Sequence, residues 1–460
     1  MGRKGWFQND MAPDALAALS KDELVALVLA LMEQNRALQA RIAELEARLG
    51  LPPKTSDNSS LPPAKGPKQN RPERQRKPRQ GHPGVARQLA TTPDVVREVL
   101  APHCTGCGQP LGSADQPELA HAYDHIDLPP IRPVITRVHL RRGSCPCCGA
   151  YVTAPPPCDM APGSPFGPGI VALVSYLHVR HMVSYRRLVE MLHGLFGLAL
   201  SEGAIANMLA RAATPFAAEA DRIETEVRRA AVIACDETSA RVKGQTCWQW
   251  VFGSASAVTH RIASSRAAAV VADFLHGATP EVWVSDRYGA QSGHGRAHQL
   301  CLAHLLRDAQ YAIDAGDRVF APGFRHLLKR ALAIGRRRQA LAQSTLVAYR
   351  RDLERRLDRL LAGRPRTPAG CKLRAAIAKC RDKLFVFVTR CDVPATNNAS
   401  ERALRPSVIF RKVTNGFRSV WGAGLYAAIC SVIATAALRG MSALEAIRLC
   451  LSGQSVLKPT

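Results

Sequence analysis

The chain has 460 residues, a formal net charge of +25 and a pI near 10.0. This length allows two to four domains and at least one large hydrophobic core. The charge indicates a polyanionic partner such as nucleic acid, although ribosomal or membrane-surface binding also fits it. The 14 cysteines include two tight pairs and several isolated residues, which favours a reducing compartment with a metal site over a secreted disulfide framework. The N-terminus carries no apolar segment typical of a secretion signal, so we expect a cytoplasmic protein.

Residues 14–50 carry a heptad pattern typical of a coiled coil. Leucines recur every seven residues at one core position, and an asparagine stands among apolar residues at the other. Because a buried asparagine pairs best with its own copy, the pattern predicts an in-register parallel homodimer. The alternative is a single amphipathic helix that packs on its own protein. The residues predicted to form the dimer contact are Leu24, Leu31, Asn35, Leu38 and Leu45.

Residues 51–95 form a linker rich in Pro, Lys, Arg, Gln and Gly, which includes the run KQNRPERQRKPRQGHPG. Such a composition is too polar to bury a core and predicts a mobile basic tether. Its charge indicates contact with DNA phosphates, and a purely solvated linker is the alternative.

Two C-x-x-C pairs, each followed by a glycine, indicate that residues 96–160 form a zinc-ribbon-like DNA-binding domain. The glycine allows the tight turn that brings two thiolates to one tetrahedral ion. The segment 124–144 is predicted to form strands that lead into the second pair. A redox role needs only one C-x-x-C pair, and Cys147 is a competing ligand of poorer spacing. The predicted Zn²⁺ ligands are Cys104, Cys107, Cys145 and Cys148.

Residues 161–228 are predicted to be helical. The segments 184–197 and 201–213 have the length of a helix-turn-helix, with Ser201 as the N-cap of the second helix. The second segment offers few long polar side chains for reading bases. Ordinary helical packing is therefore favoured over sequence readout.

Residues 229–418 change to a pattern of three strands, a helix and a fourth strand. This order is typical of a ribonuclease H-like fold, which carries one acid on its first strand and another at the end of its fourth. Asp236 and Asp286 each follow an apolar, β-prone run, and they are 50 residues apart. We expect both at strand ends. An Arg-rich stretch at about 311–384 is predicted to be a helical insertion that either contacts DNA or stays solvated.

Glu401 is the third acid and lies in what the sequence predicts to be a short helix capped by Asn397 or Asn398. Carboxylates from two strands and a helix repel one another and are tolerated mainly when divalent cations lie between them. The sequence therefore predicts a two-metal phosphoryl-transfer site that uses Mg²⁺ or Mn²⁺, with Asp236, Asp286 and Glu401 as catalytic metal ligands.

Cys301 and His304 follow the second acid in a C-x-x-H pattern. With only two ligands evident, a packing role near the active site is favoured over a second zinc ion.

Residues 419–460 are predicted to form C-terminal helices. The uncharged stretch from 419 to 438 is long enough to span a membrane. It is rich in Ala, Gly, Ser and Thr, so we expect a buried helix and no membrane contact.

The run NNASERALRPSVIFRKVTNGFRS resembles the C-terminal signature of bacterial DDE transposases of the insertion-sequence-sixty-six family. The runs CDETSARVKGQTCWQWVF and VSDRYGA stand where the family carries its other two acids. The resemblance covers most of the chain and extends to the order of its domains, and the C-x-x-H pair matches the family's Cys/His pair. Two positions depart from the family: Thr396 stands where an acidic residue is frequent, and Ser239-Ala240 replaces a Gly-Trp type pair.

The resemblance implies a DNA transposase that binds the ends of an insertion sequence and catalyses metal-dependent strand cleavage and strand transfer. It implies element-end and target DNA as partners, together with other proteins encoded by the same element. Basic residues beside the third acid are the expected phosphate contacts. These are Arg402, Arg405, Arg411, Lys412 and Arg418.

The predicted fold is multidomain α+β, with an N-terminal coiled coil, a zinc ribbon, a helical domain and a ribonuclease H-like α/β catalytic domain with a helical insertion. Two other functions stay open at this point. One is a non-catalytic, zinc-dependent DNA-binding regulator or accessory protein of a mobile element. The other is a nuclease or junction resolvase of the same fold, which would cleave without joining.

Overall fold

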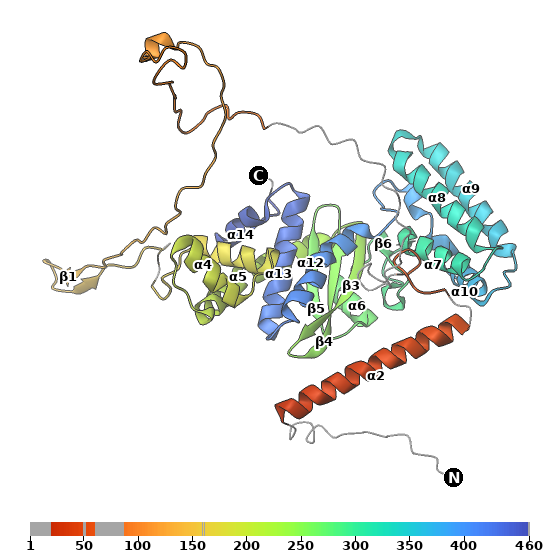
Figure 1. The fold of residues 1–460 in the computed structure, drawn as a ribbon. Helices are drawn as coiled ribbons and strands as arrows, with labels where there is room; N and C mark the ends of the chain where they lie inside the picture. The colour runs from red at the N-terminus through yellow and green to blue at the C-terminus, as the bar shows by residue number, and fades with distance from the viewer. Residues whose placement is uncertain (1–19, 49–51, 60–86, 159, 161, 459–460) are drawn as a thin grey trace. The chain divides into compact units, whose positions relative to one another are not determined.

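The structure is a computed structural model that describes residues 20–48, 52–59, 87–158, 160 and 162–458. The chain divides into two compact units. The larger unit contains residues 1–67, 161–188 and 202–460, and the smaller contains residues 68–160 and 189–201. Each unit is described by itself below (Figure 1).

A five-stranded mixed sheet forms the centre of the larger unit, with strand order β5-β4-β3-β6-β7. β3, β4 and β5 form an antiparallel meander, whereas β6 and β7 run parallel to β3. Lys243 and Gly244 both have positive φ, at 50° and 77°, as a two-residue hairpin turn between β3 and β4 requires. The strands are β3 (Val232–Val242), β4 (Gln245–Gly253), β5 (Val258–Ala263), β6 (Val282–Ser285) and β7 (Ala297–Leu300).

Helices of the larger unit precede, interrupt and follow this sheet. They are α2 (Lys21–Arg48), α3 (Pro168–Ser175) with a π-helical turn (Tyr176–Arg180), α5 (Glu202–Arg228), α6 (Ala268–Leu275), α7 (Leu302–Asp314), α8 (Ala321–Arg337), α9 (Gln343–Ala362), α10 (Pro368–Ala378), α11 (Val386–Thr389), α12 (Asn398–Thr414), α13 (Val420–Leu438) and α14 (Ala443–Leu451). The chain is therefore a mixed α/β protein, which is compatible with the multidomain α+β fold that the sequence predicted.

Stacked aromatic rings fill the core between the sheet and α6. Trp250, Phe252, Phe274 and Trp283 are all fully buried. The rings of Phe252 and Phe274 are stacked with centroids 3.8 Å apart. Burying such rings stabilises the fold by about 2–3 kcal/mol each, which holds β4, β6 and α6 together.

α13 covers the outer edge of the sheet. Ser431 and Thr435 lie one turn apart on it, and their hydroxyls accept hydrogen bonds from the β5 amides of His260 and Val258, at 2.8 and 3.0 Å. These contacts satisfy edge amides that would otherwise be buried without partners. They also explain why a helix with mean hydropathy 1.7, the one helix in the described part of the chain long and apolar enough to cross a membrane, carries hydroxyl side chains. The expectation of a buried helix is confirmed, since 61% of its most apolar stretch is buried inside the protein.

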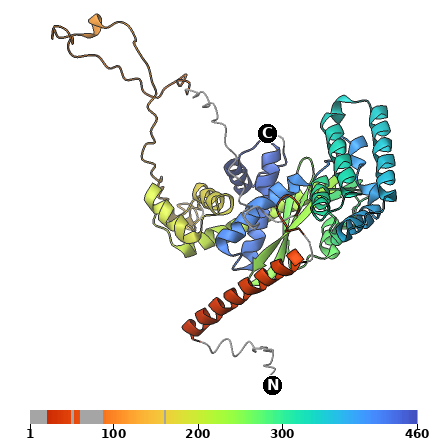
Figure 2. The same cartoon turned by 45° about the vertical axis from the view of Figure 1, so that its right-hand side comes forward.

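The Arg-rich stretch forms a helical insertion between β7 and α12. α8 and α9 run side by side as a hairpin in both views (Figures 1 and 2). Several of its arginines form ion pairs within the insertion: Arg356 and Arg330 both contact Asp352, at 2.8 and 3.4 Å, and Arg381 contacts Asp358 at 2.6 Å. These arginines therefore have intramolecular partners, which fits the solvated-hairpin alternative for this part of the insertion.

The first residues of the predicted tether contact the rest of the larger unit. Asn58 is only 5% exposed, and its side-chain amide donates to the carboxylate of Asp314 at 3.0 Å and to the carbonyl of Pro53 at 3.1 Å. This long-range contact of Asn58 was not part of the prediction for the tether, because composition does not reveal which distant residue a side chain meets. The whole of the basic run, residues 68–84, lies outside the described residues.

Two cysteine knuckles with the same backbone geometry lie in the smaller unit. In the first, the amide of Gly108 donates to the carbonyl of Cys104 at 2.9 Å; in the second, Gly149 does the same to Cys145 at 2.9 Å. Both glycines have positive φ, 78° and 71°, as the sequence predicted from their position. The strands β1 (Arg142–Ser144) and β2 (Tyr151–Thr153) pair across the second knuckle.

The expected strands in 124–144 are mostly absent, because only residues from Arg142 onward form one. The prolines at 129, 130 and 133 each lack an amide donor, which disfavours strand pairing at 129–133.

The predicted helix pair occurs as α4 (Tyr185–Phe196) and α5, and α5 begins at Glu202 directly after Ser201. α5 is 27 residues long, and its buried residues extend from Ile205 to Val227. It packs against α13. This burial supports the packing interpretation over base readout.

Candidate active site

Asp236 is the fifth of the 11 residues of β3 and lies near the middle of the strand, rather than at a strand end as the sequence predicted. The apolar run does end there, but β3 continues to Val242 because it still pairs with β4 through the turn at Lys243. Asp236 is half-buried, and its carboxylate accepts a hydrogen bond from the amide of Glu237 at 2.9 Å.

Asp286 directly follows β6, as expected. The parallel pairing of β3 with β6 sets Ala234 beside Val284, and the same register extended by two residues sets Asp236 opposite Asp286. Since neighbouring strands are about 4.8 Å apart, this register brings both carboxylates to one level of the sheet. The amide of Tyr288 donates to the Asp286 carboxylate at 2.9 Å and fixes its orientation.

Glu401 lies in the first turn of α12. This helix has 17 residues and is therefore longer than the short helix that the sequence predicted. Asn397 occupies the N-cap position, yet its side chain does not cap the helix. Its amide instead donates to the carbonyl of Cys235 on β3 at 2.7 Å, which ties the start of α12 to the strand that carries Asp236.

The three predicted acids are electrostatically coupled. Burial, followed by the charges of Glu237, Asp286 and Glu401 in that order, raises the pKa of Asp236 to about 7. One oxygen of Glu401, Oε1, is buried and has no hydrogen-bond partner within the described residues. A half-buried group of like charges, with one carboxylate oxygen that accepts no hydrogen bond, is a donor set suited to a divalent cation. The residues therefore fit the Mg²⁺ or Mn²⁺ that the sequence predicted.

Glu237 is a buried acid that the sequence did not single out. Its side chain is 1% exposed, and its carboxylate accepts hydrogen bonds from Arg266 at 2.5 and 2.9 Å and from Gln291. The Arg266 guanidinium also lies 4.6 Å and 3.9 Å from the ring centres of Trp248 and Tyr288. The Asp-Glu pair at the first acid was the signal that the sequence offered for Glu237. Its partner Arg266 is 29 residues away, so spacing does not identify it.

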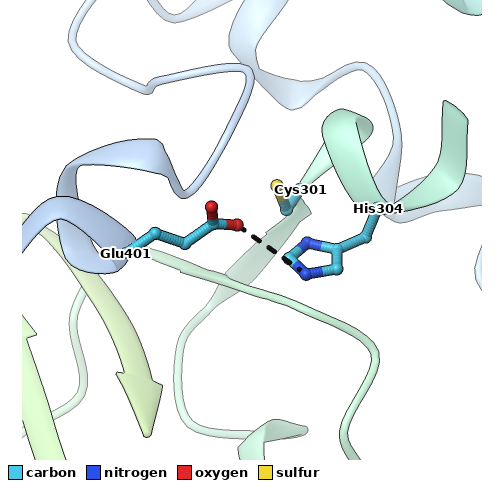
Figure 3. A group of neighbouring side chains, drawn as sticks. All are labelled: Cys301, His304 and Glu401. Carbon is cyan, nitrogen blue, oxygen red and sulfur yellow. Dashed lines mark ion pairs between the residues drawn. The ribbon is translucent and has the colours of Figure 1, made fainter. Parts of the chain in front are cut away.

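Glu401 also belongs to a second cluster, with Cys301 and His304 (Figure 3). One ligand atom from each of the three lies within 4.8 Å of the others, and His304 Nε2 is 3.7 Å from Glu401 Oε1. A hydrogen bond with Cys301 raises the pKa of His304 to about 9, and Glu401 and Asp286 act in the same direction. The sequence showed only two potential ligands here, Cys301 and His304. Glu401 on α12 is the third potential ligand.

Among the described residues, this is the one group of three or more potential ligands that meets so closely. The carboxylates of Asp236, Asp286 and Glu401 are brought to one place but do not form an equally tight set. The four knuckle cysteines are likewise not gathered into one cluster among these residues. Within each knuckle, backbone amides lower the pKa of Cys104 and of Cys145, which favours the thiolate that zinc requires.

Four of the five basic residues predicted to contact DNA are exposed. Arg402, Arg405 and Lys412 share one side of α12 beside Glu401, and Arg418 follows the helix. Arg411 is half-buried instead, and its guanidinium donates to the carbonyl and hydroxyl of Ser239 on β3. It therefore joins α12 to the sheet.

Fold and site together define a mixed α/β protein with an acidic centre where β3, β6 and α12 meet. A family model described as the IS66 family of transposases matches residues 163–424, which is more than half of the chain. The chain belongs to this family, and the resemblance found in the sequence is confirmed. No curated protein matches the chain.

Proposed function

We propose that the protein is a DNA transposase that binds the ends of an insertion sequence and carries out strand cleavage and strand transfer at Asp236, Asp286 and Glu401. The observation that carries this proposal is that the three carboxylates lie close enough to interact. The charges of Asp286 and Glu401 both raise the pKa of Asp236. The sheet order supports a ribonuclease H-like fold, in which three antiparallel strands are followed by two parallel ones.

The three carboxylates would hold Mg²⁺ or Mn²⁺. Such an ion activates the attacking hydroxyl and stabilises the leaving oxygen of the phosphodiester. Asp286 is fixed by its bond to Tyr288, and Glu401 is positioned through Asn397. Hydrolysis at the element end would free a 3′-hydroxyl, and this hydroxyl would then attack target DNA.

DNA binding is proposed to use the exposed side of α12, where Arg402, Arg405 and Lys412 lie beside the acidic centre, together with Arg418. Guanidinium groups bind phosphate oxygens strongly and would hold the scissile strand. The two knuckles are proposed to share one Zn²⁺ through Cys104, Cys107, Cys145 and Cys148. We also propose the domain boundaries predicted from the sequence. The protein is further proposed to be cytoplasmic and to act with other proteins encoded by the same element.

The test is cleavage of labelled element-end DNA by the full chain with Mg²⁺ or Mn²⁺ and with a chelator. Asp286→Asn should reduce cleavage by roughly 1,000-fold or more, because it removes a charged metal ligand, and should leave the Kd for DNA within about threefold. Asp308→Asn is the matched control, since Asp308 is a surface acid paired with Arg287. Equal cleavage by wild type and Asp286→Asn would overturn the proposal. Cleavage without strand transfer would favour the nuclease alternative, and binding without any cleavage would favour the regulator.

A further inference from the structure

We propose that Cys301, His304 and Glu401 form a Zn²⁺ site that competes with the catalytic cations for Glu401. The inhibitory part of this inference rests on the function proposed above, whereas zinc binding itself does not. Zn²⁺ bound at this site would inhibit strand cleavage.

The donor atoms of this cluster select a thiophilic ion. Thiolate and imidazole ligands favour Zn²⁺, whereas Mg²⁺ takes oxygen ligands almost exclusively. Glu401 is the one member that both kinds of ion accept. The two proposed metal sites therefore differ in chemistry but share this carboxylate.

The geometry is close to what zinc requires. Zinc–ligand bonds of about 2.0–2.3 Å give tetrahedral ligand separations of about 3.3–3.8 Å. The 3.7 Å between His304 Nε2 and Glu401 Oε1 falls in this range, and Cys301 Sγ lies within 4.8 Å of the other ligand atoms. A side-chain adjustment of about 1 Å would complete three protein ligands, leaving the fourth position open, as in zinc sites with three protein ligands.

Two further observations indicate a ligand rather than ordinary packing. Glu401 Oε1 and His304 Nδ1 are both buried and form no hydrogen bond within the described residues, and the ion pair of Oε1 with His304 Nε2 is long, at 3.7 Å, a separation that two ligands of one ion also have. The backbone amide of Asn397 donates to Cys301 Sγ at 3.1 Å, as outer-shell amides do to ligating sulfurs. The His304 side chain is 22% exposed and that of Glu401 33%, so an ion has a path from solvent.

The consequence follows from the position of Glu401. A carboxylate bound to zinc beside Cys301 is withheld from the ions at Asp236 and Asp286. Zinc would therefore reduce Mg²⁺-dependent cleavage without displacing DNA.

Zinc is counted first, on the full chain, after dialysis against buffered Zn²⁺. Cys301→Ala should bind about one ion fewer per chain than wild type, and Cys450→Ala, a buried thiol on α14, should bind the same number. The knuckle zinc is common to all three proteins and cancels in the difference. An unchanged zinc count in Cys301→Ala would overturn the site.

A second variant and a spectroscopic measurement distinguish the loss of a zinc ligand from misfolding. His304→Gln should also lose one ion, with a far-ultraviolet circular dichroism spectrum like that of wild type. With Co²⁺ as the probe, Cys301→Ala should lose thiolate-to-cobalt absorbance equivalent to one thiolate. Unchanged cobalt absorbance would contradict a ligating Cys301.

Inhibition is measured separately, as the Zn²⁺ concentration that halves Mg²⁺-dependent cleavage, with each protein normalised to its own rate without zinc. This concentration should rise about tenfold or more in Cys301→Ala and in His304→Gln relative to wild type, because each variant removes one zinc ligand. If a variant loses one zinc ion but its inhibitory Zn²⁺ concentration is unchanged, the zinc site stands and the proposed inhibition is wrong. If no metal supports cleavage, the function proposed above fails, while the zinc count still decides the site.

Discussion

Glu237 is a buried acid beside the proposed metal ligands, and its side chain has defined partners. Its buried carboxylate lies next to Asp236 along β3, and burial raises its pKa while Arg266 opposes the increase. Arg266 thus favours the charged form of Glu237 beside the proposed metal ligands. The aromatic rings of Trp248 and Tyr288 hold the guanidinium in place.

Arg266→Gln should lower the free energy of unfolding by about 2–3 kcal/mol, because it leaves the buried Glu237 carboxylate without its charged partner. Arg287→Gln, which removes an exposed ion pair with Asp308, should cost less than about 1 kcal/mol. Urea unfolding followed by tryptophan fluorescence measures both. The double variant Arg266→Gln/Glu237→Gln should recover part of the loss. Equal effects of the two single variants would contradict a special role for Arg266.

His260 contributes a pH dependence to stability. It is 5% exposed, burial lowers its pKa to about 4, and Gln249 lies 3.2 Å from its Nδ1. The folded state therefore favours the neutral ring, so its contribution to stability is fully present above a pH of about 6.5, where the unfolded chain is neutral too. As the pH falls from about 6.5 to about 4, the unfolded state alone gains the proton, and about 3 kcal/mol of stability is lost.

We expect His260→Gln to reduce the slope of unfolding free energy against pH by about 1.4 kcal/mol per pH unit between about pH 6 and about pH 4.5. The buried His298, whose pKa is likewise lowered to about 4, keeps its own contribution in this variant. Urea titrations at several pH values give the two slopes. Parallel curves for wild type and variant would show that His260 does not titrate in this way.

At the scale of elements, the loop from α12 to α13 fixes the far end of the helix that carries Glu401. Phe417 forms two backbone hydrogen bonds with the end of β3 and the turn that follows it. The Phe417 amide donates to the Arg241 carbonyl at 2.8 Å, and the Lys243 amide donates to the Phe417 carbonyl at 2.8 Å. Gly416 makes this approach possible, since its φ is 113° and a Cβ there would lie 2.6 Å from the Arg241 carbonyl oxygen. The loop thus joins α12 to the strand of Asp236.

Gly416→Ala should lower the unfolding free energy by more than about 2 kcal/mol, because both the backbone conformation and the contact with Arg241 become strained. Gly424→Ala is the matched control: a Cβ at Gly424 in α13 meets open space. That change should be neutral or stabilise by up to about 1 kcal/mol. Thermal denaturation of both variants measures the difference, and a tolerated Gly416→Ala would show that the loop adapts.

At the scale of the whole molecule, α2 presents an apolar stripe that a single chain leaves uncovered. Leu24 is 38% exposed, Leu31 54%, Leu38 56% and Leu45 44%, although they recur at one heptad position. Asn35 is exposed and accepts a hydrogen bond from Gln39 at 3.0 Å. A parallel coiled-coil dimer would bury this stripe, and it stays our prediction for how two catalytic units are brought to two element ends.

The variant Leu31→Glu/Leu38→Glu should be monomeric at micromolar concentration, because charges at core positions of a coiled coil oppose association. Sedimentation equilibrium or light scattering measures the mass directly. Glu33→Gln, on the outer face of the same helix, should keep the mass of wild type. Equal masses for the wild type and the leucine variant would show that α2 does not carry the association.

The sequence by itself determined what depends on short-range geometry. Heptad leucines, the glycine that closes each cysteine knuckle, the strand that precedes Asp286 and the start of α5 after Ser201 all depend on backbone preferences within a few residues. The family signature around Glu401 supplied the third acid from the order of the amino acids alone. Each of these features is local, and local propensity is readable from composition and spacing.

Only the tertiary structure decided which distant side chains meet. The β3–β6 register sets Asp236 opposite Asp286, and the start of α12 places Glu401 between that pair and Cys301 with His304. The partnership of Glu237 with Arg266, and of Ser431 and Thr435 with the edge of β5, arose in the same way. Contacts of this kind depend on how whole elements pack, and the free energy of packing is shared among many residues, so no single stretch of sequence encodes it.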